Sequence, residues 1–235
     1  MKAFLCLLWA ATTLVRAASP GYEIRAAHDP NGIGKFYLGR EIAHVMGHEG
    51  ADWLERPERA AEEKPDVMVD LLGIKNGESV ADVGAGSGYM SWRLAQKVGT
   101  NGVVYATDIQ QEMLDLLSEN MRKRGTRNVK PVLGTLTDSK LPTNTLDLVI
   151  MVDVYHELSD PYEMMTSIVS SLKPGGRMVF IEYRAEDPNV PIKAVHKMSE
   201  TQVKKESAVV GLEWIETKET LPWQHMIFFR KPVKP

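Results

Sequence analysis

The sequence predicts an α/β protein with an open, doubly wound sheet of seven strands, mostly parallel, covered by helices on both faces. From Ser79 onwards, short runs rich in Val, Ile and Leu alternate with segments of helical periodicity. Nearly continuous apolar runs such as 146–152 are typical of parallel strands buried on both faces. A closely spaced strand pair, expected at 214–220 and 226–230, ends the alternation.

The composition limits the function classes. The chain has 235 residues, of which 43% are hydrophobic and 25% charged, enough for one domain with a substantial core and an appendage. The net charge is −3 and the pI is about 6.1, so no basic field exists to attract nucleic acid. We therefore expect no nucleic-acid partner.

Residues 1–18 resemble a secretory signal peptide. Lys2 is followed by the apolar run 3–15, and Val15-Arg16-Ala17 fits a cleavage site with small residues at −3 and −1. The run is too short for an ordinary transmembrane helix, so we expect export and no stable membrane association after leader cleavage. An uncleaved leader would instead anchor the protein to a membrane or leave it in the cytoplasm. The only cysteine, Cys6, lies in this leader, so the mature chain would have no disulfide.

The N-terminal arm, residues 19–63, is expected to cover the ligand site as a lid. Its first part, 19–39, is predicted to be irregular, and residues 40 to about 54 are predicted to form a helix. His44 and His48 would share a face of that helix with the spacing of two metal ligands. Because H-x-x-x-H is common by chance and no third ligand is certain, no metal site is predicted. The candidate lining residues of the lid are Tyr37, His44, His48 and Trp53.

The main domain, residues 64–235, is predicted to begin with a helix that stops at Gly73. Strands are expected at 80–83, 103–107, 129–133, 146–152, 178–183, 214–220 and 226–230. Helices are expected through Met90, Leu94 and Val98, and at 110–124, 162–172 and 199–210, and a turn is expected at 173–176. Ligands of such sheets bind beyond the carboxyl ends of the strands, so the site is sought there.

A glycine-rich loop, residues 82–88, follows the first of these strands with the sequence Asp-Val-Gly-Ala-Gly-Ser-Gly. Glycine has no Cβ, so the loop can turn tightly and approach a ligand closely. The helix that follows directs its free N–H groups at whatever the loop holds. Twenty residues after Gly88, Asp108 ends the second strand, where it can accept hydrogen bonds from both hydroxyls of a ribose. Asp82 can hold the loop amides or a ligand ammonium group.

These residues together resemble the class I S-adenosylmethionine-dependent methyltransferases. The resemblance covers about half of the chain, residues 64 to 183, and it includes Asp82–Gly88, Asp108, the Leu141-Pro142 step before Asp147-Leu148-Val149, and Leu172–Gly176. It implies a Rossmann-like sheet with an antiparallel final strand, and S-adenosyl-L-methionine as the cofactor. The cofactor-binding residues that it implies are Asp82, Gly84, Ala85, Gly86, Gly88, Asp108, Ile109, Thr135, Leu136 and Asp153.

One departure weakens the adenine assignment. Many relatives carry an acidic residue directly after the glycine of the third-strand loop, whereas this chain has Gly134-Thr135. The exocyclic amine of adenine is then left to Thr135, Thr137 or Asp138.

Candidate catalytic residues follow the fourth strand in the run Asp153-Val154-Tyr155-His156-Glu157. By the resemblance, Asp153 contacts the amino-acid end of the cofactor and the residues after it face the methyl group. His156 is the candidate general base, because an imidazole can accept a proton near neutral pH, and Asp153 and Glu157 are the other catalytic candidates. The candidate substrate-binding residues are Tyr155, Glu182, Tyr183 and Arg184, and His196 and Lys197 are candidates for an opposite rim.

The sequence leaves three functions open. The run after the fourth strand looks like that of quinone-biosynthesis methyltransferases, which favours methyl transfer to a small-molecule acceptor, with oxygen or sulfur as the nucleophile. Gly86-Ser87-Gly88-Tyr89 is similar to protein carboxyl methyltransferases that repair isoaspartate, but the later run is not. A non-catalytic S-adenosylmethionine-binding protein is the third alternative. The sequence predicts no oligomeric state.

Overall fold

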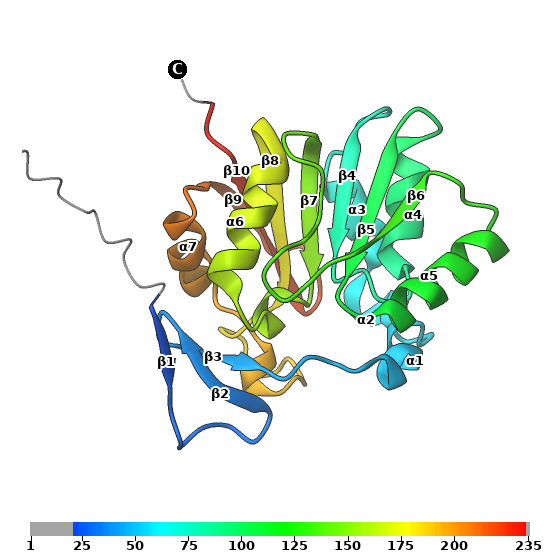
Figure 1. The fold of residues 1–235 in the computed structure, drawn as a ribbon. Helices are drawn as coiled ribbons and strands as arrows, with labels where there is room; N and C mark the ends of the chain where they lie inside the picture. The colour runs from blue at the N-terminus through cyan, green and yellow to red at the C-terminus, as the bar shows by residue number, and fades with distance from the viewer. Residues whose placement is uncertain (1–20, 234–235) are drawn as a thin grey trace, which may run out of the picture.

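The computed structural model describes residues 21–233, and the expected signal peptide at 1–18 lies outside this range. The main sheet contains β4 (Ser79–Val83), β5 (Val103–Asp108), β6 (Val129–Leu133), β7 (Leu146–Val152), β8 (Leu172–Tyr183), β9 (Glu213–Lys218) and β10 (Gln224–Arg230). Their spatial order is β6-β5-β4-β7-β8-β10-β9 (Figure 1). Neighbouring strands are parallel except around β10, which runs antiparallel to β8 and β9. The predicted fold class, with its antiparallel final strand, is confirmed.

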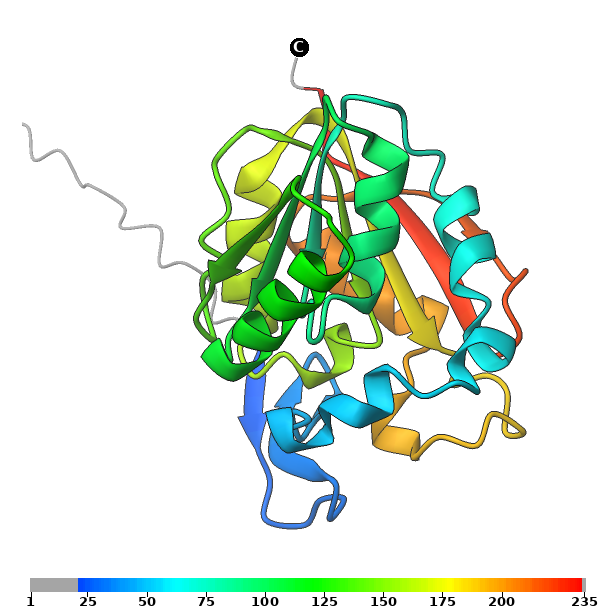
Figure 2. The ribbon, with the colours of Figure 1, turned by 90° about the vertical axis from the view of Figure 1, so that its right-hand side faces the viewer.

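Helices cover both faces of this sheet (Figures 1 and 2). One face carries α3 (Pro65–Leu71), α4 (Tyr89–Val98) and α5 (Gln111–Lys123), and the other carries α6 (Pro161–Ser171) and α7 (Glu200–Val209). Successive side chains of β7 point to opposite faces of the sheet, so the strand contacts both helix layers. Met151 packs with Ile168 of α6 on one face. Leu148 and Ile150 pack with Leu94 of α4 on the other face. Between residues 21 and 233, no helix has the length and apolarity needed to cross a bilayer.

The N-terminal arm runs beneath the carboxyl ends of the parallel strands (Figures 1 and 2). It begins as a small antiparallel sheet in the order β1-β2-β3. Its elements are β1 (Tyr22–Ile24), β2 (Gly32–Tyr37), β3 (Arg40–Ala43), the 3-10 turn η1 (His48–Gly50), α1 (Ala51–Leu54) and α2 (Arg59–Glu63). The arm is therefore strand followed by short helices, and the lid predicted as helical is largely not helical.

The single helix predicted from 40 to about 54 is wrong for its first part. Leu38 has φ 48° and Gly39 has φ 94°, and together they make a tight turn that pairs β2 with β3. Arg40 then donates hydrogen bonds of 2.9 and 3.0 Å to the buried carboxylate of Glu206 on α7. This tertiary ion pair holds the segment as a strand, which a local helical pattern does not predict.

The turn predicted at 173–176 lies within β8, which begins earlier than expected. Leu172 already pairs with Leu146 of β7, and the register then shifts between Leu146 and Leu148. Gly175, with φ 78°, takes the left-handed conformation at this irregularity. The glycine does mark an irregularity in the backbone, but strand pairing with β7 continues on both sides of it, so no separate turn forms.

Candidate active site

A cavity of about 470 Å³ lies at the carboxyl ends of β4, β5 and β7, against the N-terminal arm. Its volume lies within the range of small-molecule sites. One side, here called the glycine-loop half, is formed by residues 82–86 and Asp108. The other side, here called the histidine half, is formed by His156, Glu157 and His196. One cavity thus joins the two groups of residues that the sequence singled out.

Two glycines of the loop are required by the backbone and by close approaches. Gly84 has φ 69° and Gly86 has φ 51°, a region that favours glycine. A Cβ on Gly84 would lie 2.6 Å from both γ-carbons of Val154. Gly88, predicted to pass under the cofactor, lies outside the cavity lining, and a Cβ there would meet Leu117 Cγ at 2.8 Å. Gly88 therefore permits the packing of α5 beside the loop.

Two buried aspartates organise the glycine-loop half. Asp108 accepts hydrogen bonds of 3.0 Å from the backbone N–H groups of Gly86 and Gln110, and burial raises the pKa of its carboxyl. Asp82 accepts a 2.6 Å hydrogen bond from the Ser91 hydroxyl, and burial raises its pKa to about 6. Both carboxylates line the cavity, so they can hold the loop and face a ligand.

Asp153 lies where β7 ends, in the left-handed conformation with φ 55°. Gln224 donates a 2.9 Å hydrogen bond to its Oδ2, while its Oδ1 is buried and has no hydrogen-bond partner among the described residues. Burial raises the pKa of this carboxyl well above its usual range. Arg59 lines the same cavity and bonds to Glu63 at 2.7 Å. Asp153 thus offers an unpartnered carboxylate oxygen and Arg59 a guanidinium to the same cavity, which suits a ligand with both an ammonium and a carboxylate group.

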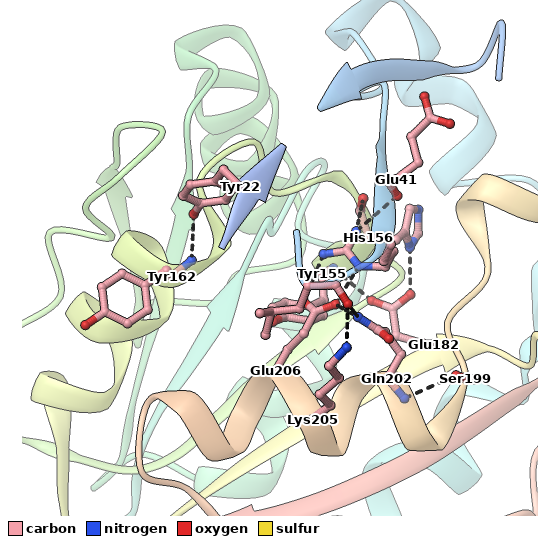
Figure 3. Close-up of polar contacts among 12 residues, drawn as sticks. Tyr22, Glu41, Tyr155, His156, Tyr162, Glu182, Ser199, Gln202, Lys205 and Glu206 are labelled. Atoms are coloured by element: carbon pink, nitrogen blue, oxygen red, sulfur yellow. Dashed lines mark hydrogen bonds and ion pairs between the residues drawn. The ribbon is translucent and has the colours of Figure 1, made fainter. Parts of the chain in front are cut away.

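In the histidine half, a buried carboxylate orients His156. Its Nδ1 lies 2.6 Å from Oε2 of Glu182, whose Oε1 accepts a 2.8 Å hydrogen bond from the Tyr155 N–H (Figure 3). Because a carboxylate only accepts, Nδ1 carries a proton, so the lone pair of the neutral imidazole is on Nε2. Glu182 was predicted to touch substrate, but it lies behind His156 and outside the cavity lining. Its role is to position the imidazole.

Glu157 and His196 complete the histidine half. Oε1 of Glu157 lies 3.9 Å from Nε2 of His156 and 3.7 Å from Nδ1 of His196. The Met46 N–H donates to the other oxygen, Oε2, at 3.3 Å. Burial raises the pKa of Glu157 to about 7 and lowers the pKa of His196 to about 4. A carboxyl group that titrates near neutrality and an uncharged imidazole therefore face the same space.

The structure brings most of the predicted site residues to the cavity and leaves the others outside it. The predicted residues in the lining are Trp53, Asp82, Gly84, Ala85, Gly86, Asp108, Ile109, Leu136, Asp153, His156, Glu157, Tyr183 and His196. The predicted residues outside the lining are Tyr37, His44, His48, Gly88, Thr135, Tyr155, Glu182, Arg184 and Lys197.

Packing explains why three of the predicted substrate and lid residues lie outside. Tyr37 and Tyr155 are each 1% exposed. The Tyr155 ring packs edge-on against Phe180 at 4.8 Å between ring centroids. Arg184 points to the start of β10, where it donates a 2.6 Å hydrogen bond to the carbonyl of Gln224. These side chains therefore serve packing and hydrogen bonding outside the cavity.

Three other predicted residues outside the lining, His44, His48 and Thr135, are exposed. His44 and His48 share no helix face, because β3 and the loop after it replace the predicted helix. Thr135 accepts a 3.1 Å hydrogen bond from the Asp138 N–H within its own loop, so its hydroxyl closes that loop. Leu136, its neighbour, does line the cavity. Leu136, and not Thr135, therefore faces the cavity, because the conformation of this loop is not specified by the residue order alone.

Several lining residues were not predicted from the sequence. The arm supplies an apolar wall and the Arg59–Glu63 ion pair to the cavity. The i,i+4 spacing of Arg59 and Glu63 on a helix is the one local pattern that could have indicated this pair from the sequence. The unpredicted lining residues include Val45, Met46, Leu54, Arg56, Arg59, Glu63, Gln110, Met113, Ser139, Leu158, Ser159, Met164, Pro191, Ile192 and Lys193.

Comparison with known proteins identifies the class. The family described as a methyltransferase domain matches residues 74–226, more than half of the chain. This protein therefore belongs to the methyltransferase-domain family. It is an S-adenosylmethionine-dependent methyltransferase, and S-adenosylmethionine is its cofactor. The residues fit this cofactor, since the glycine loop, Asp108 and the unpartnered Oδ1 of Asp153 all border the cavity.

Individual relatives are more distant. The ubiquinone/menaquinone biosynthesis C-methyltransferase UbiE of Idiomarina loihiensis is 28% identical over 116 residues, 49% of this chain and 46% of that protein. The chain thus matches about half the length of this curated relative. A SAM-dependent methyltransferase from Aquifex aeolicus superposes with a TM-score of 0.75 at 26% identity, covering 79% of this chain and 99% of that one. An arsenic(III) methyltransferase from Chlamydomonas reinhardtii shares the fold, with a TM-score of 0.52 at 20% identity over 68% of this chain and 65% of that one.

Proposed function

We propose that this enzyme methylates a small-molecule acceptor through an ionisable oxygen or sulfur, with His156 as the general base. The observation that carries the proposal is the single cavity that joins the glycine loop to His156, whose Nδ1 is held 2.6 Å from Glu182. The lone pair of Nε2 is then available to an acceptor proton.

In this proposal, one group of residues binds the cofactor and another removes the proton of the acceptor. Asp108 and Asp153 hold the ribose and the amino-acid end of the cofactor, which supplies a methyl group already activated on a sulfonium. His156 accepts the acceptor's proton, and Glu182 stabilises the imidazolium that forms. The apolar Met46 of the arm excludes water from this half of the cavity.

Methylation at carbon is the second candidate function. The curated relatives are named C-methyltransferases, and a phenol that loses its proton activates its ring carbons as nucleophiles. The proton removal assigned to His156 serves this reaction equally. The position of the added methyl group on the product distinguishes the two reactions.

The acceptor class can be tested with labelled S-adenosylmethionine and a panel of phenols, thiols and isoaspartyl peptides, in buffer containing EDTA. We expect label in phenols or thiols and none in peptides. Label confined to the isoaspartyl peptides would replace the proposal with protein carboxyl methylation. Mass spectrometry of the labelled product then locates the methyl group on oxygen, sulfur or carbon.

We also propose that residues 1–18 direct export. The apolar run after Lys2 and the small residues near Ala17 support this. The mass of the mature N-terminus from fractionated cells tests it. An intact leader in the cytoplasmic fraction would contradict it.

A further inference from the structure

Three metal-ligating side chains converge in the histidine half of the cavity. His156, Glu157 and His196 each offer one ligand atom, and these atoms all lie within 4.8 Å of one another. They come from two separate 3-10 turns, η2 (Tyr155–Glu157) and η3 (Ala194–His196), which contact each other. Within residues 21–233 this is the one group of at least three such side chains with this spacing.

The separations between these donors are too long for direct hydrogen bonds. Oε1 of Glu157 lies 3.9 Å from the His156 nitrogen and 3.7 Å from the His196 nitrogen. Donors around a tetrahedral cation with bonds of about 2.1 Å lie about 3.4 Å apart. The two imidazole rings already stand edge to face, with centroids 5.1 Å apart. A small inward rotation of the side chains therefore gives a coordinating geometry.

Outer hydrogen bonds aim these donors at a common point. Glu182 holds Nδ1 of His156 at 2.6 Å and leaves Nε2 as the free nitrogen (Figure 3). The Met46 N–H holds Oε2 of Glu157 and leaves Oε1 free. A carboxylate behind a histidine is the usual support of a metal ligand, because it fixes the ring and its tautomer. Both outer partners are present before any cation binds.

We propose that His156, Glu157 and His196 form a binding site for a first-row divalent cation such as Zn²⁺ or Co²⁺. Two imidazoles and one carboxylate suit these cations, whereas Mg²⁺ and Ca²⁺ prefer all-oxygen sites. With three protein ligands, at least one coordination position faces the cavity, where a phenolate or thiolate acceptor would bind. This consequence rests on the proposed function. With a cation on Nε2, His156 no longer accepts the acceptor's proton; the cation would instead lower the pKa of the bound phenol or thiol, which releases its proton to solvent.

The test measures binding of Zn²⁺ to the chelator-treated full chain by calorimetry, without cofactor or acceptor. We expect one equivalent to bind, and we expect Co²⁺ to give the intense visible absorption of a tetrahedral site. His196→Gln should weaken Zn²⁺ binding at least tenfold, and Glu182→Gln should weaken it about tenfold through the outer bond. His44→Gln, at an exposed histidine outside the cavity lining, is the matched control and should bind as the wild type does.

Absence of Zn²⁺ binding by the wild type, or unchanged affinity in His196→Gln, would overturn the site. Equal loss in His44→Gln would show adventitious binding to surface histidines and would overturn it too. Thermal melting of each variant verifies that it is folded. The measurement is independent of the proposed general base, since turnover in EDTA tests that role with the cation removed.

Discussion

The two halves of the cavity are built from different kinds of sequence. The glycine-loop half comes from one continuous run, residues 82–86, together with Asp108 on the next strand. The histidine half joins η2 to η3, about forty residues later in the chain, and is closed by Met46 of the N-terminal arm. Its orienting carboxylate, Glu182, comes from yet another strand. The first half is a local motif, whereas the second depends on how distant segments dock.

This difference separates the general task from the specific one. The backbone conformation of the loop and one acidic strand end are enough to hold a common cofactor, so the first half can recur with little change. The acceptor differs between enzymes, and loops from several elements can change without disturbing the sheet. Mutations in the first half should therefore affect cofactor affinity, and mutations in the second should affect turnover.

The largest expected effect is on turnover in the histidine half. His156→Gln should lower turnover on a phenolic acceptor roughly 10²- to 10⁴-fold, because the proton acceptor is lost. Cofactor affinity should stay nearly unchanged. Steady-state kinetics in EDTA, with calorimetry of cofactor binding, separates the two quantities, and His44→Gln is the control.

A comparison of a thiol acceptor with the phenol tests whether the loss of turnover is due to the loss of proton removal. A thiol of low pKa is already ionised, so the variant should lose much less activity on it. Loss of cofactor binding in His156→Gln would show that the side chain shapes the pocket, and full turnover on a phenol would remove it from the mechanism.

In the glycine-loop half, Gly86→Val should weaken cofactor binding by a factor on the order of a hundred or more. A Cβ at Gly86 would lie 2.5 Å from Cδ1 of Leu54 and would project into the cavity lining. Gly125→Val is a matched control, because its φ of 65° imposes similar strain while no atom lies within 4 Å of its Cβ. Calorimetry should show normal binding by the control. Equal affinities of both variants would mean that backbone strain, and not the loop's place in the site, explains the effect.

Asp82 gives a pH-dependent effect on stability. Burial raises the pKa of its carboxyl to about 6, helped by Asp108 and opposed by the Ser91 hydrogen bond and Arg59. Because the folded-state pKa lies above that of the unfolded chain, the ionised group destabilises the fold above about pH 6, and protonation at lower pH removes this cost.

Asp82→Asn removes the charge and keeps an acceptor for Ser91. Its free energy of unfolding should exceed that of the wild type by about 2–3 kcal/mol near pH 8, and the difference should vanish towards about pH 4. Urea unfolding at both pH values measures this. A difference independent of pH would show that Asp82 is neutral throughout or acts only through packing.

The smallest effect is expected at Asp108. Asp108→Asn keeps the shape but loses the charge that strengthens its hydrogen bonds to the ribose, so cofactor affinity should fall about tenfold, or about 1.4 kcal/mol. Asp187→Asn is the control, because Asp187 accepts a similar 2.8 Å backbone hydrogen bond from Asn189 in an exposed loop outside the lining. Equal affinities of wild type and Asp108→Asn in calorimetry would contradict the ribose assignment.

The sequence by itself determined the features that depend on local patterns. Alternating apolar runs predicted the strands, since a buried parallel strand must be apolar on both faces. The spacing of the loop glycines and Asp108 predicted the glycine-loop half, because backbone conformation and the end of one strand are local properties. His156 was predicted for the same reason, as it closely follows the end of β7.

Only the tertiary structure decided which side chains support His156 and which accompany it. Glu182 is on β8, and its position behind the imidazole depends on the pairing of β7 with β8. The sequence named His196 only as a candidate for an opposite rim, and its place beside His156 and Glu157 depends on the docking of η3 against η2. Arg40 forms a strand, contrary to the helical pattern, because its ion pair with Glu206 links segments 166 residues apart. Such contacts depend on packing free energy across the whole fold, which local residue patterns do not record.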